Sequence, residues 1–204
     1  EVFASMRMND LHDGFMPSER PTFKRENPQW LLPQLRDGFA STHPVDVPGL
    51  ERYKQWPDTK ERRMATSLNY AIPEVRQLKL DVIRELIENY DFDGIELDWS
   101  RHNNHFAPGT EWDNRHILTD FHREVRNIAD AAARKWGHPV LVLPRVPETL
   151  HGCSVGGYDV AAWMRDEIVD GLILGDMVIN VSYLQQFRDI SPRKTLLYPS
   201  VYGY

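Results

Sequence analysis

Hydrophobic and polar residues follow two different periods along the chain, and each period predicts its own kind of element. Within 73–89, apolar side chains recur every three to four residues, as they do on the buried face of a helix. A second stripe of this kind spans 117–132 and is followed by Gly137, a residue type that commonly ends helices. Asp113 is the expected N-cap of the second helix, with Thr110 as the alternative.

Short apolar runs with β-strand character alternate with these helices. They span 1–10, 92–99, 139–146, 171–176 and 195–204. A further short helix is expected at 159–166, with Asp159 as its cap. Residues 11–66 show little periodicity and are rich in proline, so we expect one long, ordered loop there. Strands that alternate with helices indicate βαβ units and a parallel sheet.

Every expected strand ends in polar residues. Functional groups at the carboxyl ends of several parallel strands are typical of a (β/α)₈ barrel, also called a TIM barrel. A doubly wound sheet would usually carry a glycine-rich phosphate turn after an early strand. The chain has no such turn, since the Gly-Gly-Tyr at 156–158 lacks the required glycine spacing. We therefore expect an α/β protein of the barrel type, with 1–204 as a single domain.

Composition narrows the classes of partner. The chain is 41% hydrophobic and 26% charged, which suffices for a core, and its net charge of −6 argues against a nucleic-acid groove or an anionic membrane as main partner. Cys153 is the only cysteine, so an intrachain disulfide is impossible. There is no run of 18 apolar residues and no visible leader, so we expect no membrane span.

The clearest chemical signal lies in the strand at 92–99. Side chains alternate along a strand, so Glu96, Asp98 and Ser100 share one face, with successive residues of the three roughly 6.6–6.8 Å apart. If Ile95, Leu97 and Trp99 face the helices, the two carboxylates point into the barrel. Glycoside hydrolysis uses such a pair of carboxylates. The alternative is a structural acid pair that arginines neutralise.

Two resemblances support this interpretation. The segment DGIELDW resembles the fourth-strand motif of family 18 chitinases, in which a catalytic Glu would stand at the position of Ser100; Asp98 is then the last acid on that face. More widely, residues 2–12, 27–32 and 67–102 resemble the family-10-like glycosyl hydrolase group of bacterial (β/α)₈ barrel proteins. This likeness implies that the five strands are the third to seventh of a partial barrel.

The candidate site residues lie at these strand ends. Asp98 is the expected general acid, and Glu96, Glu148 and Asp176 are the other candidate catalytic carboxylates, because the expected seventh strand has no acid. The candidate substrate-binding residues are Arg7, Asn9, Asp10, His12, Tyr70, Arg101, His102 and Arg145. The three arginines either compensate the acids or bind an anionic sugar. Because no HxH or HExxH pattern is present, we expect neither a metal nor another cofactor.

The sequence thus predicts a hydrolase of glycosidic bonds in an oligo- or polysaccharide. Two alternatives remain: a barrel that binds carbohydrate without cleaving it, and a metal-dependent hydrolase of another bond. The resemblance implies a secreted or periplasmic bacterial protein. A closed barrel takes about 250 residues, so the 204 residues are expected to be a piece that lacks the first two strands and the eighth.

Overall fold

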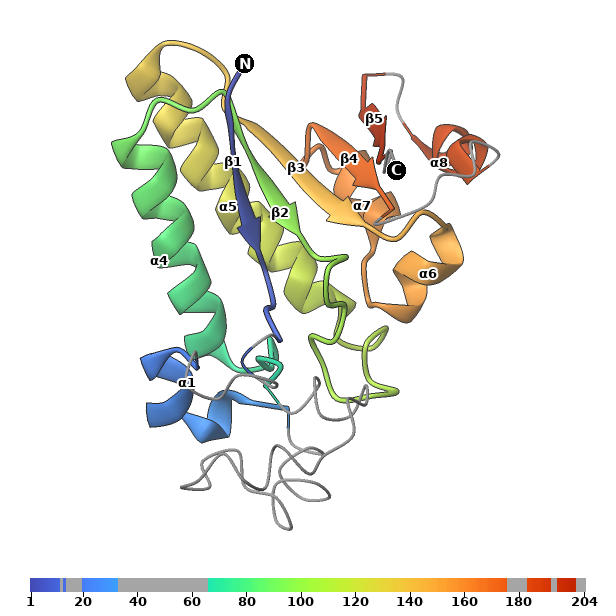
Figure 1. Ribbon diagram of the computed structural model, residues 1–204. Helices are drawn as coiled ribbons and strands as arrows, with labels where there is room; N and C mark the ends of the chain where they lie inside the picture. The colour runs from blue at the N-terminus through green and yellow to red at the C-terminus, as the bar shows by residue number, and fades with distance from the viewer. Residues whose placement is uncertain (12, 14–19, 33–65, 176–182, 192–193, 201–204) are drawn as a thin grey trace, which may run out of the picture.

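The computed structural model describes residues 1–11, 13, 20–32, 66–175, 183–191 and 194–200. Strands and helices alternate along most of the chain, as predicted (Figure 1). In chain order the elements are β1 (Phe3–Arg7), α1 (Thr22–Glu26), the 3₁₀ helix η3 (Pro28–Trp30), α4 (Pro73–Asn89), β2 (Gly94–Asp98), α5 (Arg115–Trp136), β3 (Leu141–Val146), α6 (Leu150–Val155), α7 (Val160–Arg165), β4 (Gly171–Leu174), α8 (Leu184–Ile190) and β5 (Leu196–Pro199).

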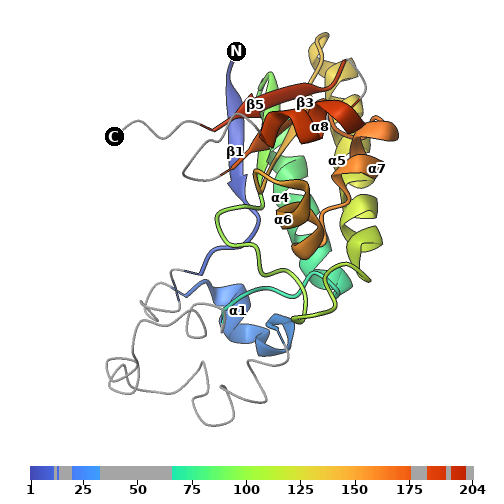
Figure 2. The same ribbon diagram turned by 90° about the vertical axis from the view of Figure 1, so that its right-hand side faces the viewer.

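The five strands form one parallel sheet in the order β1-β2-β3-β4-β5, so each strand pairs with its neighbours in the sequence. Parallel neighbours require crossover connections, and every connection between these strands contains at least one helix. Figure 2 shows α4 and α5 on the same side of β1 and β2. A doubly wound sheet reverses its strand order at a switch point, and the described strands show no reversal.

The two faces of β2 differ as the alternation predicted. Ile95 and Leu97 are fully buried in the hydrophobic core beneath the helices, whereas Glu96 and Asp98 lie on the opposite face. The strand register places Arg7 of β1, Asp98 of β2 and Arg145 of β3 side by side at the carboxyl ends of their strands. We call this face, which carries the two acids, the inner face of the sheet.

Local sequence explains three of the helix ends. Proline suits the first turn of α4, where a backbone N–H is not needed, and Pro73 begins that helix. Gly137 ends α5 with a φ of 81°, a left-handed conformation that favours glycine. The carboxylate of Asp159 accepts a hydrogen bond from the Ala162 backbone N–H at 3.1 Å and caps α7, as predicted.

The N-cap prediction for α5 is wrong. Asn114, rather than Asp113, precedes the first helical residue, and its side chain donates to Thr110 instead of accepting from the helix. The long loop expected at 11–66 is also corrected in part, because 20–32 contain α1 and η3. Helices α6 and α8 were likewise not expected. None of the helices in the described part of the chain has the length and apolar character to cross a membrane.

Strand β2 begins at a glycine because the neighbouring strands approach it closely. A Cβ atom on Gly94 would lie 2.4 Å from the Phe3 ring and 2.7 Å from the Leu141 carbonyl oxygen. Contacts this short exclude any larger residue without movement of β1 or β3. Glycine at position 94 therefore allows β1 and β3 to pack closely against the start of β2.

Candidate active site

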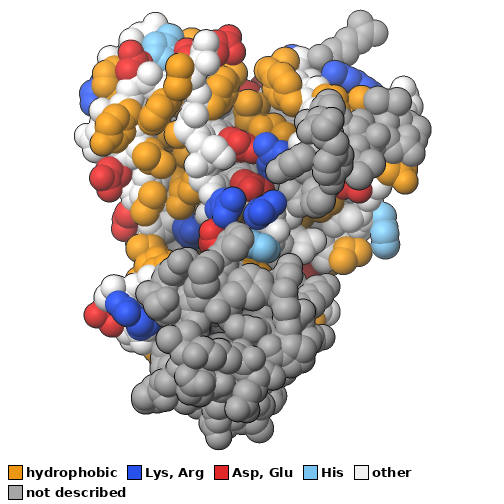
Figure 3. Space-filling view, viewed as in Figure 1, with side chains coloured by type: hydrophobic (Ala, Val, Ile, Leu, Met, Phe, Trp, Pro, Cys, Tyr) orange, Lys and Arg blue, Asp and Glu red, His pale blue; other side chains and the backbone are white. Residues whose placement is uncertain are grey.

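Charged side chains of both signs gather near the middle of the inner face (Figure 3). The carboxylates of Glu96 and Asp98 are largely buried there, with 15% and 14% of their side chains exposed. Burying a carboxylate is costly unless a cation or hydrogen-bond donors compensate it. The position of these two acids therefore depends on the groups around them.

Arg145 is the main cation at this cluster. Its Nε atom donates to Oε1 of Glu96 at 2.5 Å and lies 4.0 Å from Oδ1 of Asp98. Its Nη1 atom donates to the hydroxyl of Ser200 at 3.0 Å. Because Ser200 follows β5, this one side chain connects β2, β3 and the end of β5 across the inner face.

Asp98 also shapes the turn that leaves β2. Its Oδ1 atom accepts a hydrogen bond from the Arg101 backbone N–H at 3.0 Å. Ser100 Oγ and Arg101 Nε in this turn are buried atoms that have no hydrogen-bond partner among the described residues. Buried polar atoms are nearly always paired in proteins, so these two atoms are exceptions to the usual pattern.

Arg7 extends the cluster toward β1. Its Nη1 atom lies 3.1 Å from Oδ2 of Asp10, and about half of each side chain is exposed. The Arg7 carbonyl oxygen accepts a hydrogen bond from Nζ of Lys79 on α4, at 3.2 Å. Arg7 and Asp10 are thus half-exposed at the carboxyl end of β1, and their role in substrate binding stays a prediction.

Asn9 does not belong to an accessible site, and its assignment to substrate binding is corrected. It is 1% exposed, and its amide nitrogen donates to the carbonyl oxygens of Asn104 at 2.8 Å and Leu68 at 3.3 Å. Its amide oxygen accepts from the Leu68 backbone N–H at 3.0 Å. Asn9 therefore ties the end of β1 to two distant loops and has a structural role.

Tyr70 is corrected in the same way. Its ring is fully buried and packs edge-on against Trp99, with ring centroids 5.1 Å apart, and its hydroxyl donates to the Met8 carbonyl oxygen. Burial raises the pKa of Tyr70 well above its usual value. Trp99 faces the helices as expected, where its indole N–H donates to Nε2 of His122 at 3.2 Å. Neither ring is available to stack on a sugar.

The other candidate residues have less defined surroundings. Glu148 is half-buried in the turn after β3, and His102 is half-buried in the loop after β2. His105, which the sequence also places after β2, is fully buried, and burial lowers its pKa to about 3. Two candidates, His12 and Asp176, lie outside the described residues.

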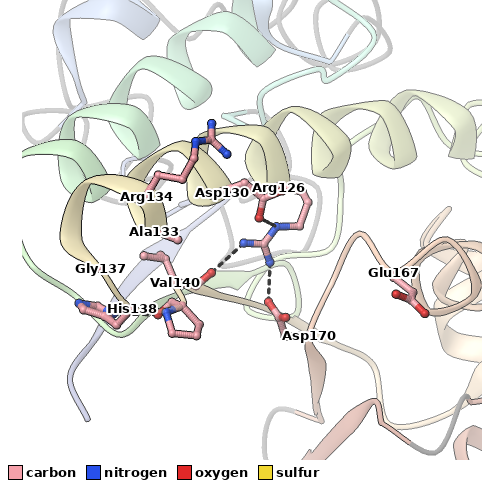
Figure 4. A pocket seen from close by; sticks show the side chains of 10 residues that line it. Arg126, Asp130, Ala133, Arg134, Gly137, His138, Val140, Glu167 and Asp170 are labelled. Carbon is pink, nitrogen blue, oxygen red and sulfur yellow. Dashed lines mark hydrogen bonds and ion pairs between the residues drawn. The ribbon is translucent and has the colours of Figure 1, made fainter.

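A cavity of about 740 Å³ lies at the other end of the strands from this charged cluster (Figure 4). Three of its charged groups are paired with one another, since Arg126 lies 2.6 Å from Asp170 and 2.8 Å from Asp130 and also donates to the Val140 carbonyl oxygen at 2.9 Å. Asp170 in turn accepts from the Val142 backbone N–H at 2.7 Å. These contacts join α5 to the start of β3 and β4, so this cavity is a structural feature of the amino-terminal end of the sheet.

Within the described part of the chain, no group of three or more His, Cys, Asp and Glu side chains is arranged to hold a metal ion. The site residues that sequence reasoning missed are Ser200, which binds Arg145, and Lys79, which binds the Arg7 carbonyl. The position of Ser200 just after β5 is the same strand-end signal that identified the other candidates. Lys79 has no such signal, because it lies on a helix.

Comparisons with known proteins give limited support. No family model and no curated protein matches the chain, so the family-10-like resemblance is not supported. One similar solved structure is a glycoside hydrolase family 18 N-acetylglucosaminidase from Paenibacillus barengoltzii, with 17% sequence identity and a TM-score of 0.47. The match covers 63% of this chain, which spans 45% of that protein's length. Similarity of this degree assigns neither fold nor activity to the chain.

Proposed function

We propose that this chain is part of a (β/α)₈ barrel glycoside hydrolase that acts on an oligo- or polysaccharide at the inner face of the sheet. The observation that carries the proposal is the pair Glu96 and Asp98, held on one face at the carboxyl end of β2 next to Arg145. The sequential order of the five parallel strands supports the barrel, because consecutive strands are neighbours in that fold.

The contacts of Glu96 and Asp98 indicate a different role for each acid. Arg145 binds Glu96 directly at 2.5 Å, so Glu96 is an ion-pair partner that fixes the guanidinium. Asp98 lies nearer the strand end, 4.0 Å from the same guanidinium, and its side chain reaches the turn where buried polar atoms of Ser100 and Arg101 lack partners among the described residues. Asp98 is therefore the acid placed to contact a bound ligand.

In the proposed mechanism, Asp98 protonates the glycosidic oxygen as the sugar bond breaks. A second carboxylate must then activate water or attack the sugar. Glu148 after β3 is the remaining candidate among the residues that the structure describes. Arg145 and Arg101 supply positive charge beside these acids and bind hydroxyl or acidic groups of the sugar. We place such an enzyme outside the cytoplasm, where polymeric sugars are met.

The test is a glycan library incubated with the wild-type protein and with Asp98→Asn, followed by analysis of products and of binding. Loss of a general acid is expected to lower turnover by about 10²- to 10⁴-fold, while binding stays measurable. The matched control is Asp113→Asn, which removes an exposed acid from the same β2–α5 connection and should leave turnover unchanged.

Unchanged turnover in Asp98→Asn would refute the role of Asp98. Binding of glycans by the wild-type protein without any product would instead favour the non-catalytic carbohydrate-binding barrel. The Arg145–Glu96 pair is compatible with that alternative, because it removes one of the two acids from catalysis.

A further inference from the structure

The inner face of the sheet has an apolar part beside its charged part. In Figure 3, hydrophobic side chains border the cluster of charged side chains. Strands β1 to β3 supply charged residues, whereas the segments of β4 and β5 contain none. The side chains that β5 turns toward this face therefore determine what the apolar part can bind.

Leu196 and Tyr198 are the residues of β5 that lie on the inner face. The hydroxyl of Ser200, which directly follows the strand, accepts a hydrogen bond from Nη1 of Arg145 at 3.0 Å on this face. Leu197 points the other way and packs against the hydrophobic core. Because side chains alternate along a strand, Leu196 and Tyr198 share the side of Ser200.

The strand register places Tyr198 in one row with the candidate catalytic acid. Asp98 of β2 pairs with Arg145 of β3, Arg145 with Ile173 of β4, and Ile173 with Tyr198 of β5. Paired residues of neighbouring strands project from the same side of a sheet. The row therefore runs from a carboxylate through a guanidinium and an aliphatic side chain to an aromatic ring.

A single side chain spans the distance between the acids and the end of β5. Nε of Arg145 donates to Oε1 of Glu96 at 2.5 Å. Nη1 of the same guanidinium donates to Ser200, two residues after Tyr198. A ligand that lies over Asp98 and is larger than a guanidinium group therefore reaches the ring of Tyr198.

The ring of Tyr198 is open to such a ligand. The residue is 43% exposed, and Leu196 on the same face is 40% exposed. The Tyr198 hydroxyl forms no hydrogen bond with the described residues. Tyrosine combines a flat apolar ring with a hydrogen-bond donor. A sugar matches both features, since it has C–H groups on the faces of its ring and hydroxyls around its edge.

We propose that Tyr198 is a substrate-binding residue of this site, with its ring against the C–H face of a sugar and its hydroxyl bonded to a sugar hydroxyl. The role rests on the proposed function, because the substrate is the same. The inner face then has two tasks: the acids of β2 act on the glycosidic bond, and β5 holds a sugar ring in place. Tyr198 contributes affinity and orientation and takes no part in proton transfer.

The experiment measures binding of cellotetraose, chitotetraose, maltotetraose and tetragalacturonate to the whole chain by calorimetry. The parent chain and all variants carry Asp98→Asn, so that the sugars are not consumed. Tyr198→Ala should weaken binding of the sugars that the parent binds by about tenfold or more. Tyr198→Phe keeps the ring and should lose only the few-fold contribution of one neutral hydrogen bond. The matched control, Tyr90→Ala, removes a similarly exposed tyrosine at the opposite end of the strands and should have no effect.

Urea denaturation of the same variants separates a binding role from a structural one. Tyr198→Ala and Tyr198→Leu should both bind weakly yet unfold at about the same urea concentration as the parent, because the side chain is exposed. Equal sugar affinities of the parent and Tyr198→Ala would overturn the role of Tyr198, leave the glycoside hydrolase proposal standing and indicate that another part of the protein covers this ring. Binding of none of the four sugars by the folded parent would overturn it too, whereas the glycan library alone decides the proposed function.

Discussion

Two histidines in the core make the stability of this protein depend on pH in a specific window. His105 and His122 are fully buried, and their hydrogen bonds fit neutral rings. His122 accepts from the Trp99 indole N–H at 3.2 Å, so its other nitrogen carries the proton that faces the Leu118 carbonyl oxygen at 2.7 Å. Burial lowers the pKa of His105 to about 3 and that of His122 to about 4.

The sign of the effect follows from proton binding. In the unfolded chain both rings have the ordinary pKa of 6.5, so below that pH the unfolded state binds more protons than the folded state. The stability contributed by the neutral rings is complete above pH 6.5 and is lost as the pH falls toward the folded pKa values. Between about pH 6.5 and 5.5, the two residues together should lower the free energy of unfolding by about 2 kcal/mol.

Urea denaturation at a series of pH values measures this loss directly. His122→Gln and His105→Gln each remove one titrating ring, so each should reduce the slope of the free energy of unfolding against pH by about half in this window. His151→Gln, at an exposed position on α6, is the control. If a variant with both substitutions shows the same slope of the free energy of unfolding against pH as the wild type, the reasoning is refuted.

Three further substitutions test the packing around the sheet. Arg145→Met should lower the free energy of unfolding by about 3 kcal/mol in urea denaturation, because Glu96 loses its cation. Adding Glu96→Gln should restore part of the lost stability, and no recovery in this double variant would contradict the pairing. Gly94→Ala should cost about 2 kcal/mol or more, since its Cβ would meet the Phe3 ring, and a neutral effect by the same assay would show that β1 moves easily. Arg126→Met should lower the melting temperature without changing glycan binding, and a change in binding would contradict a purely structural role for that end of the sheet.

The elements could be predicted from the sequence wherever a local pattern decides them. The apolar stripe after Pro73 and the left-handed Gly137 mark a start and an end of two helices, and both signals come from residues close in the sequence. Helix α8 gave no comparable signal, because it has seven residues and only Phe187 of them is buried. Its position therefore depends on packing that short-range periodicity does not contain.

The sequence predicted on which face of β2 the two acids lie, but not which residues the other candidates contact. The alternation in β2 correctly placed Glu96 and Asp98 opposite the core. Asn9 follows the expected strand-end pattern and Tyr70 precedes the helix at Pro73, yet Asn9 bonds residues 59 and 95 positions away, and Tyr70 bonds Met8 62 positions away. Contacts at such separations depend on how the loops fold back, which no local rule specifies.

The alternation along β2 has a consequence for how this protein can evolve. Ile95 and Leu97 are fully buried and hold the strand in the core, as does Trp99 just after it, whereas Glu96 and Asp98 face away from the core. Mutations at the buried positions are therefore purged by loss of folding. A change at Asp98 alters the strand end directly, whereas a change at Glu96 also breaks its ion pair with Arg145, so the two acids are not equally free to vary.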